Sequence, residues 1–411
     1  MRVIHRVRCP HAIKNCFYQA PAFTVTVVRT CQRYAYILLG AMFFMLFVWW
    51  STLDSSECDG PEVVEHVCQV YNEKYTTGNL CHELCVTKQL DLHSCYSYKD
   101  DLKRYRVDDI IFKVVDNPNL VFKEERIEEG LTSAEFLQQV KDLLLYELGH
   151  PNTDLLLKQL VLDFDINQDG KINLGEAQNM WWVLIQPNFL NFYIFQDSVS
   201  IPHLNGTCGG ISVWYYLYLM EGTSLYRKTT PWPISIFTSN FYRWTLPHWS
   251  LRAKVMLSLV ELVEEMYEKD GVRYHLCNVN GLSLYHHSSY EVAITDDTML
   301  LSSQQIHNRL SNITCHYAHD CILTPQCQTS CEFSSRQCTD RIIRPTIAVV
   351  CDVMIDYLLF DTPKEIKVSL NRAITRCQSI SVYTQQLDLV HSLLILDLKS
   401  ILWNYIQNKL K

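Results

Sequence analysis

The chain has 411 residues, of which 48 % are hydrophobic and 19 % charged, enough apolar material for one large or two ordinary globular domains. Its 17 cysteines are unusual for a cytosolic enzyme. Residues 1–33 hold six Lys or Arg and no acid; taking these six from the 36 leaves 30 basic against 44 acidic residues, a net charge of −14, in the remainder. This acidic charge argues against nucleic acid as a partner, because binding to phosphates needs a basic surface.

An uncharged run follows the basic tail. Residues 34–53 (YAYILLGAMFFMLFVWWSTL) are long enough to cross the ~30 Å hydrocarbon core as one helix. The Lys/Arg excess before the run predicts a cytoplasmic tail over 1–33 and a luminal body after it, as in a single-pass type II membrane protein. A cleaved signal peptide is the alternative, but its apolar region is usually shorter and a small-x-small cleavage site should follow it. We therefore predict an uncleaved signal anchor.

Fourteen cysteines follow this run, an even number, as a closed set of disulfides requires. They cluster over 58–95 and 315–338, and the first cluster predicts a cysteine-rich, loop-like luminal stem over 54–100. Zinc is the alternative for the second cluster, since His316 and His319 lie within it. No paired CxxC occurs there, and an oxidising lumen favours disulfides over thiolate ligands.

The rest of the chain alternates strand-like and helical patterns. An amphipathic helix over 132–148 begins at a Thr132/Ser133 cap and ends at Gly149. The order suits a two-lobed α+β fold from residue 101 to 411. The other expected elements are strands in RVDDIIFKVV and NLVFKEE within 104–123, strands at 211–220 and 290–294, and helices at 251–269, 345–358 and 380–408. Separately, N-glycosylation sequons begin at Asn205 and Asn312.

Residues 165–176 (DINQDGKINLGE) fit the twelve-residue EF-hand calcium loop. Gly170 at position 6 allows the sharp turn, Ile172 at position 8 is apolar, and helical patterns flank the loop within 153–186. An Asx-rich surface turn is the alternative, but it does not require a match at each of these positions. The predicted Ca²⁺ ligands are Asp165, Asn167, Asp169, the carbonyl of Lys171, Asn173 through water, and Glu176.

Several motifs fall together along the chain. They are GNLCHELC at 78–85, LVFKEE around Lys123, the calcium loop running into LGEAQNMWWVLIQ, LNGTCGG at 204–210, HLCNVN at 275–280, VAITDD at 292–297 and IAVVCD at 347–352. With the N-terminal anchor, they resemble the divergent protein kinase domain 1 family, also called family with sequence similarity 69. The resemblance implies an endoplasmic-reticulum type II membrane protein with a cysteine-rich, luminal, protein-kinase-like domain and an inserted EF-hand.

The resemblance implies two nucleotide contacts. Lys123, at the end of a strand-like run, matches the lysine that binds ATP phosphates, and Glu135 or Glu147 is its carboxylate partner. An exposed strand-end lysine is the alternative. Asp296 or Asp297 matches the aspartate that holds Mg²⁺, with an ordinary turn as the alternative.

The catalytic loop departs from the family pattern. The family reads Leu-Cys-Asp with an Asn five residues after the Asp, whereas this chain has Asn278 and Ser283 at those positions. An amide cannot accept the substrate proton as a carboxylate does, and Ser is a poorer Mg²⁺ ligand than Asn. No glycine occurs between Gly78 and Gly130, so a Gly-rich phosphate loop is missing as well.

Three functions remain open from the sequence. The first is a calcium-responsive pseudokinase that serves as a scaffold or regulator for an unknown luminal protein. The second is an active secretory-pathway kinase, using ATP and Mg²⁺ with rearranged catalytic residues. The third is a disulfide-stabilised, calcium-binding structural protein without a kinase fold. Arg6-Val7-Arg8 resembles a retrieval signal, in keeping with the endoplasmic reticulum membrane, although it is also ordinary positive-inside charge.

Overall fold

The computed structural model describes residues 40, 42–46, 60–88, 95–99, 102–107, 110–115, 132–149, 153–215, 223–225, 246–279, 284–286, 289–295 and 299–410. The chain divides into two compact units, residues 1–58 and 59–411. In the first unit, residues 42–46 are helical and their apolar side chains are exposed. The other residues of the expected anchor, and the basic tail, lie outside the described residues.

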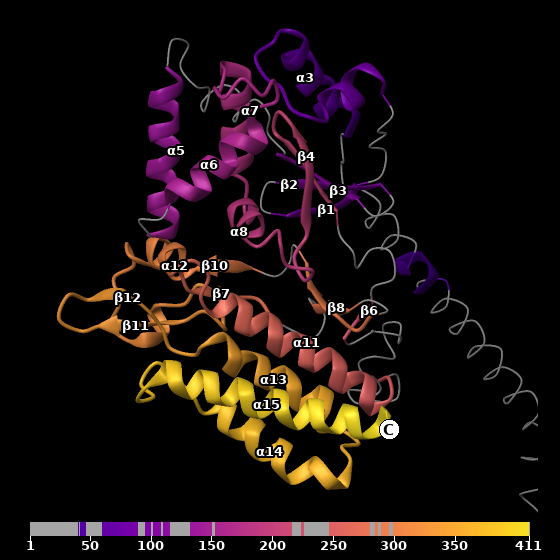
Figure 1. Cartoon of the computed structure of the whole chain (residues 1–411), viewed down its shortest axis with the longest axis vertical. Coiled ribbons are helices and arrows are strands. Elements are labelled where there is room, and N and C mark those ends of the chain that lie inside the picture. The colour runs from indigo at the N-terminus through magenta and orange to yellow at the C-terminus, as the bar shows by residue number, and fades with distance from the viewer. Residues whose placement is uncertain are drawn as a thin grey trace, which may run out of the picture. The chain divides into compact units, whose positions relative to one another are not determined.

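The second unit contains a five-stranded antiparallel sheet (Figure 1). Its strand order is β1-β2-β3-β5-β4, so β3 and β5 lie next to each other in its interior. The expected single strand RVDDIIFKVV is two strands, because β2 ends at Val107 and β3 begins at Ile110. The bounds are β1 Cys95–Lys99, β2 Leu102–Val107, β3 Ile110–Val115, β4 His203–Cys208 and β5 Ile211–Tyr215.

Four helices separate β3 from β4 in the sequence: α5 (Ser133–Leu148), α6 (Thr153–Phe164), α7 (Leu174–Leu184) and α8 (Phe189–Ile194). The predicted caps of α5 are confirmed, since Thr132 forms a capping box with Glu135 and Gly149 adopts the left-handed conformation. α8 packs against the sheet through aromatic rings, with Phe189 and Phe192 lying 5.4 Å and 5.8 Å from the ring of Trp214 on β5.

The expected loop-like stem is largely folded. Residues Gly60–Asn72 form α3 and His82–Val86 form a π-helical turn, η2. Disulfide Cys68–Cys85 joins these two elements, and Cys81–Cys208 fixes them to β4. Gly78 passes so close to β4 that a Cβ atom would lie 2.1 Å from the carbonyl oxygen of Thr207. This part therefore belongs to the same core as the sheet.

The C-terminal half is mainly helical (Figure 1). The long helices α11 and α13 pack together, and the Trp249 indole donates a 2.7 Å hydrogen bond to the Leu358 carbonyl at the end of α13. Helix α14 was not predicted from the sequence, and the last helix begins at Leu387, later than the predicted residue 380. The elements are β6 Thr223–Ser224, α11 Trp249–Tyr267, β7 Tyr274–Leu276, β8 Leu284–His286, β9 Val292–Ile294, β10 Leu300–Ser302, α12 Ser303–Leu310, η4 Ala318–Asp320, β11 Thr329–Glu332, β12 Gln337–Ile342, α13 Thr346–Leu358, α14 Lys364–Gln378 and α15 Leu387–Leu410.

Among the described residues, α15 is the one helix long and apolar enough to cross a membrane. A packed helix of a globular domain passes the same test of length and composition. Leu394, Leu398 and Leu402 are fully buried, and Lys399 Nζ lies 2.7 Å from Glu264 of α11. We therefore interpret α15 as a helix of the folded domain.

Candidate functional site

The loop between α6 and α7 is folded around the side chain of its first residue. Asp165 Oδ1 accepts a hydrogen bond from the Asp169 amide at 3.2 Å, and Oδ2 accepts one from the Gly170 amide at 2.7 Å. Asn167 Oδ1 accepts a second bond from Asp169 at 2.9 Å. Gly170 has φ +77°, the left-handed conformation that glycine adopts without strain. The turn expected at positions 1 to 6 of the loop is therefore present.

Glu176 closes the other end of the loop. Its side chain is 1 % exposed, and Oε1 accepts a 3.0 Å hydrogen bond from the Ile166 amide while Oε2 accepts one from Asn173. Asn173 Oδ1 accepts in return from the Glu176 amide, which forms a capping box at the start of α7. The carboxylate at position 12 thus accepts hydrogen bonds from backbone amides near both ends of the loop.

The donor set fits Ca²⁺, a hard cation that prefers oxygen ligands. Asp165 and Glu176 are both buried, and neither they nor Asp169 form an ion pair with a described residue. Lys171 is exposed, and its ammonium forms no ion pair with a described residue. Buried carboxylates without a counter-charge are costly, and a bound cation would offset that cost.

The helix that leaves the loop is bonded to the sheet. Asn179 donates a 2.9 Å hydrogen bond to Thr207 on β4, between buried side chains. At the end of α7, Gln186 donates to the Gly210 carbonyl at 2.8 Å and accepts from Ser212 Oγ at 2.6 Å. Ser212 in turn accepts a 3.0 Å bond from the Trp214 indole. α7 therefore connects the loop to Trp214 through polar contacts.

The helix that enters the loop reaches the same tryptophan. Asp163, at the end of α6, accepts a short hydrogen bond from the Tyr193 hydroxyl, and burial together with this carboxylate raises the pKa of Tyr193. The Tyr193 ring stacks on Phe189 at 5.8 Å, and Phe189 meets Trp214 edge to face at 5.4 Å. The two helices that flank the loop thus converge on one residue of β5.

A buried lysine lies over this tryptophan. Lys113, on β3 opposite Ser212, is 2 % exposed, and its Nζ lies 4.8 Å from the Trp214 ring centroid and 4.9 Å from that of Phe192. Lys113 was not among the residues predicted from the sequence. The sequence does contain a sign of this site, because Lys113 lies within the apolar run IIFKVV. A strand that is buried on both faces rarely carries a charged residue without a specific role.

Most of the residues predicted to bind nucleotide lie outside the part of the chain that the structure describes. Lys123, Ser283, Asp296 and Asp297 lie outside the described residues. Glu135 is exposed and bonds Thr132 at 2.7 Å and 2.8 Å as part of a helix cap, and the Thr132 backbone hydrogen bond lowers the pKa of Glu135. This carboxylate therefore caps the start of α5.

Asn278 is half-buried in a loop held from both sides. Cys277 forms a disulfide with Cys327, and its carbonyl accepts a short hydrogen bond from Thr324. The Val279 amide donates to Gln326 Oε1 at 2.8 Å, and Gln326 Nε2 donates back to the Val279 carbonyl at 2.6 Å. The segment 277–279 is thus a fixed part of the C-terminal half.

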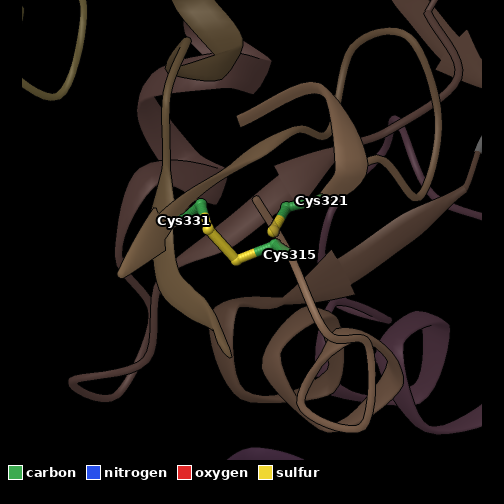
Figure 2. Close-up of side chains that lie close together, drawn as sticks. All are labelled: Cys315, Cys321 and Cys331. Carbon is green, nitrogen blue, oxygen red and sulfur yellow. A yellow bond between two sulfur atoms is a disulfide. The ribbon is translucent and has the colours of Figure 1, made fainter. Parts of the chain in front are cut away.

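The prediction of disulfides over zinc is confirmed. The sulfur atoms of Cys315, Cys321 and Cys331 lie within 4.8 Å of one another (Figure 2), but they belong to two disulfides and offer no thiolate to a metal. The side chains of Cys58 and Cys95 lie outside the described part of the structure. The described pairs are Cys68–Cys85, Cys81–Cys208, Cys277–Cys327, Cys315–Cys331, Cys321–Cys338 and Cys351–Cys377.

Two family models match the chain. Residues 27–154 match the model described as the N-terminal cysteine-rich endoplasmic-reticulum part of FAM69, and residues 180–380 match the protein-kinase domain of FAM69. The second match includes β4, β5, the Asn278 loop and the cysteine cluster. The loop 165–176 falls between the two matched ranges, so its assignment depends on its own residues.

Proposed function

Because the chain belongs to the FAM69 family, we propose that it is a calcium-binding, protein-kinase-like membrane protein of the endoplasmic-reticulum lumen that acts as a pseudokinase scaffold or regulator. The observation that carries the proposal is Asn278 at the position of the catalytic aspartate. Its amide cannot take the proton of a substrate hydroxyl, a function that contributes on the order of 10²–10⁴-fold to rate. The contacts that hold 277–279 leave the backbone of this loop little freedom to bring another group into place.

The effect of calcium binding at the loop would reach the sheet through a series of side-chain contacts. Binding at Asp165 and Glu176 would neutralise two buried carboxylates and change how α6 and α7 lie against each other. Trp214 is connected to α7 through Ser212 and Gln186, and to α6 through Phe189 and Tyr193. Lys113 lies over its ring. The proposed response to calcium is therefore a change in the packing around Lys113, which a luminal partner would sense through the sheet.

The proposed location follows from chemistry on both sides of the apolar run. A body with six described disulfides persists only in an oxidising compartment. The basic tail favours the cytoplasm, so residues 34–53 are proposed as the type II anchor between them.

An active kinase is the second candidate, and Lys113 favours it. This lysine is buried on β3, beside β5, in a sheet next to the helical half of the domain. A cation there suits the charge of ATP phosphates. In this alternative, Asp296 or Asp297 would hold Mg²⁺ and another group would replace Asn278 as the base.

The two candidates differ in phosphate transfer. We propose to incubate the detergent-solubilised full chain with radiolabelled ATP, Mg²⁺ and Ca²⁺, with itself and a generic acidic protein as acceptors. The pseudokinase proposal expects the same background labelling in the wild type and in Lys113→Met. Labelling that depends on Lys113 and exceeds this background would instead establish an active kinase.

A further inference from the structure

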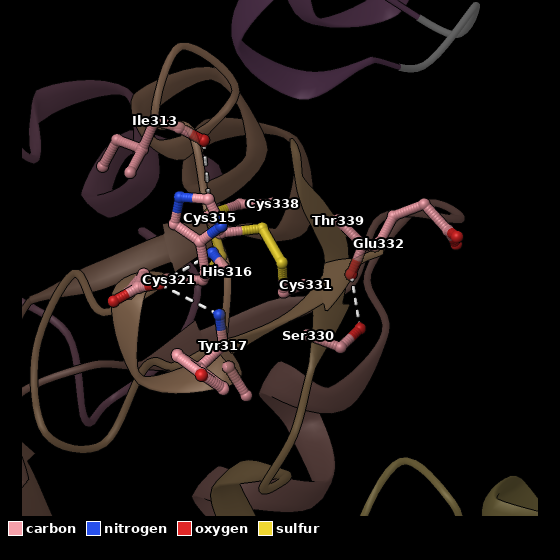
Figure 3. The surroundings of a disulfide bond; sticks show 12 residues. Ile313, Cys315, His316, Tyr317, Cys321, Ser330, Cys331, Glu332, Cys338 and Thr339 are labelled. Carbon is pink, nitrogen blue, oxygen red and sulfur yellow. Dashed lines mark hydrogen bonds between the residues drawn. A yellow bond between two sulfur atoms is a disulfide. The ribbon is translucent and has the colours of Figure 1, made fainter. Parts of the chain in front are cut away.

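Two disulfides lie side by side in the segment 315–338 (Figures 2 and 3). Cys315 pairs with Cys331, and Cys321 pairs with Cys338. The sulfur of Cys321 lies within 4.8 Å of both sulfurs of the Cys315–Cys331 bond. All four side chains are buried, and Cys331 is the most exposed of them at 8 %. One disulfide is therefore within reach of the other after a small displacement.

A second pairing of the same four cysteines also fits the backbone. Cys331 and Cys338 are direct partners in the antiparallel ladder of β11 and β12. Residues opposite each other in such a ladder have Cα atoms about 4.5–5.5 Å apart, within the range that a disulfide bridges. The pair left over is Cys315 and Cys321, whose sulfur atoms already lie within 4.8 Å.

We propose that these four cysteines form a thiol–disulfide exchange site, which is attacked by the thiolate of a small thiol or of a dithiol oxidoreductase and returns that thiolate unchanged. The incoming thiolate attacks Cys331 Sγ, forms a mixed disulfide and releases the Cys315 thiolate. Cys315 attacks Cys321 Sγ and releases the Cys338 thiolate. Cys338 then attacks Cys331 and expels the incoming thiolate. Each step breaks one S–S bond and forms another, so the site is isomerised without net oxidation or reduction.

The pairing affects the loop that holds Asn278. The Thr329 amide donates a 2.9 Å hydrogen bond to the Cys321 carbonyl, which closes the loop 321–329. The same loop contributes Thr324, Gln326 and Cys327 to the contacts around 277–279. In the observed pairing Cys321 ties this loop to β12, whereas in the second pairing it is tied to Cys315. Exchange would therefore change how the loop that supports Asn278 is held.

Cys315→Ser tests the exchange in the full chain. The variant frees the Cys331 thiol beside Cys321–Cys338, and after alkylation and pepsin digestion at acidic pH we expect a Cys331–Cys338 peptide with Cys321 alkylated. Retention of Cys321–Cys338 with Cys331 alkylated would overturn the proposal. Cys351→Ser is the matched control, because it frees Cys377, which belongs to no such sulfur group among the described residues; its other described pairs should remain.

A second measurement needs no variant and so does not depend on how Cys315→Ser folds. The wild-type chain is incubated with a trace of reduced glutathione at mildly alkaline pH, where thiolates form, and is then quenched with acid. The proposal expects Cys331–Cys338 and Cys315–Cys321 to appear together while the other described disulfides persist. Unchanged pairing in this segment, when added dithiothreitol at the same pH does reduce it, would contradict an exchange site.

Discussion

The ammonium of Lys113 lies 4.8 Å from the centre of the Trp214 ring. The same ring is bonded through Ser212 to Gln186 at the end of α7, and it packs against Phe189 of α8. Lys113 and the two helices that flank the loop 165–176 are thus connected through one aromatic residue. A change at the loop has a short physical path to Lys113.

Gln186→Leu should break the polar part of this path. The leucine preserves volume but leaves the Gly210 carbonyl and the Ser212 hydroxyl without this partner in a buried site, at a cost of about 1–3 kcal/mol in stability. We also expect the calcium-induced change in tryptophan fluorescence to shrink, with Trp214→Phe identifying the part that comes from Trp214. An undiminished Trp214 signal in Gln186→Leu would show that the coupling runs elsewhere.

Lys113→Met should remove nucleotide binding more completely than Lys123→Met. Methionine fills a similar apolar volume between Phe192 and Trp214 but carries no charge for the ATP phosphates. The measurement is the shift of the thermal midpoint by ATP–Mg²⁺ in each variant. If wild-type binding survives in Lys113→Met and disappears in Lys123→Met, then the lysine originally expected from the sequence is the correct one.

Asn278→Asp should restore a general base if the remaining machinery is present. A positioned carboxylate contributes about 10²–10⁴-fold, so phosphate transfer should rise by at least about tenfold, and further in Asn278→Asp combined with Ser283→Asn. Asn278→Ala is the control and should remain at background. Equal labelling in all of these variants would mean that the defect lies outside the catalytic loop.

Stability should fall in mildly acidic solution because of a buried histidine. His391 on α15 is 2 % exposed and stacks on Tyr267 at 3.7 Å. Burial lowers the pKa of His391 to about 4, and this effect outweighs the carboxylates of Asp388 and Glu264, which raise it. The unfolded chain takes up the proton near pH 6.5 while the folded chain does not, so stability present above pH 6.5 is lost as the pH falls toward 4.

His391→Phe should weaken this pH dependence, since phenylalanine retains the stacking but cannot bind a proton. We expect the loss of unfolding free energy between pH 6.5 and 4.5 to be smaller by about 1–2 kcal/mol than in the wild type. His319→Gln is the matched control, because His319 is largely exposed. Parallel stability curves for wild type and His391→Phe would show that other groups dominate.

Local patterns predicted much of the fold. The caps at Thr132 and Gly149, the helices around the loop and α13 follow from short-range periodicity and capping chemistry. The break between β2 and β3 was missed because Asp108-Asp109 lacks glycine or proline, the strongest turn signals. The helical content of the stem was missed because its cysteines suggested loops.

The site was only partly predictable. The loop 165–176 is contiguous, so its spacing alone predicts the oxygen donors, and calcium binding by them stays a prediction. Lys113 depends on strand order, since only the pairing of β3 with β5 brings it over Trp214. The disulfide partners likewise depend on the tertiary fold, as with Cys81 and Cys208. Contacts between residues far apart in the chain cannot be predicted from the local pattern of a single sequence.

The most direct test of the central claim is calcium-dependent thermal unfolding of the detergent-solubilised full chain, compared with Glu176→Gln and Lys171→Ala. Glutamine can keep the helix cap but removes the charge at position 12, whereas the alanine keeps the carbonyl expected to bind calcium. At calcium 100-fold above Kd, the account predicts about 2.7 kcal/mol of stabilisation in the wild type and Lys171→Ala, and almost none in Glu176→Gln. No calcium effect in the wild type, or the same effect in all three proteins, would contradict it.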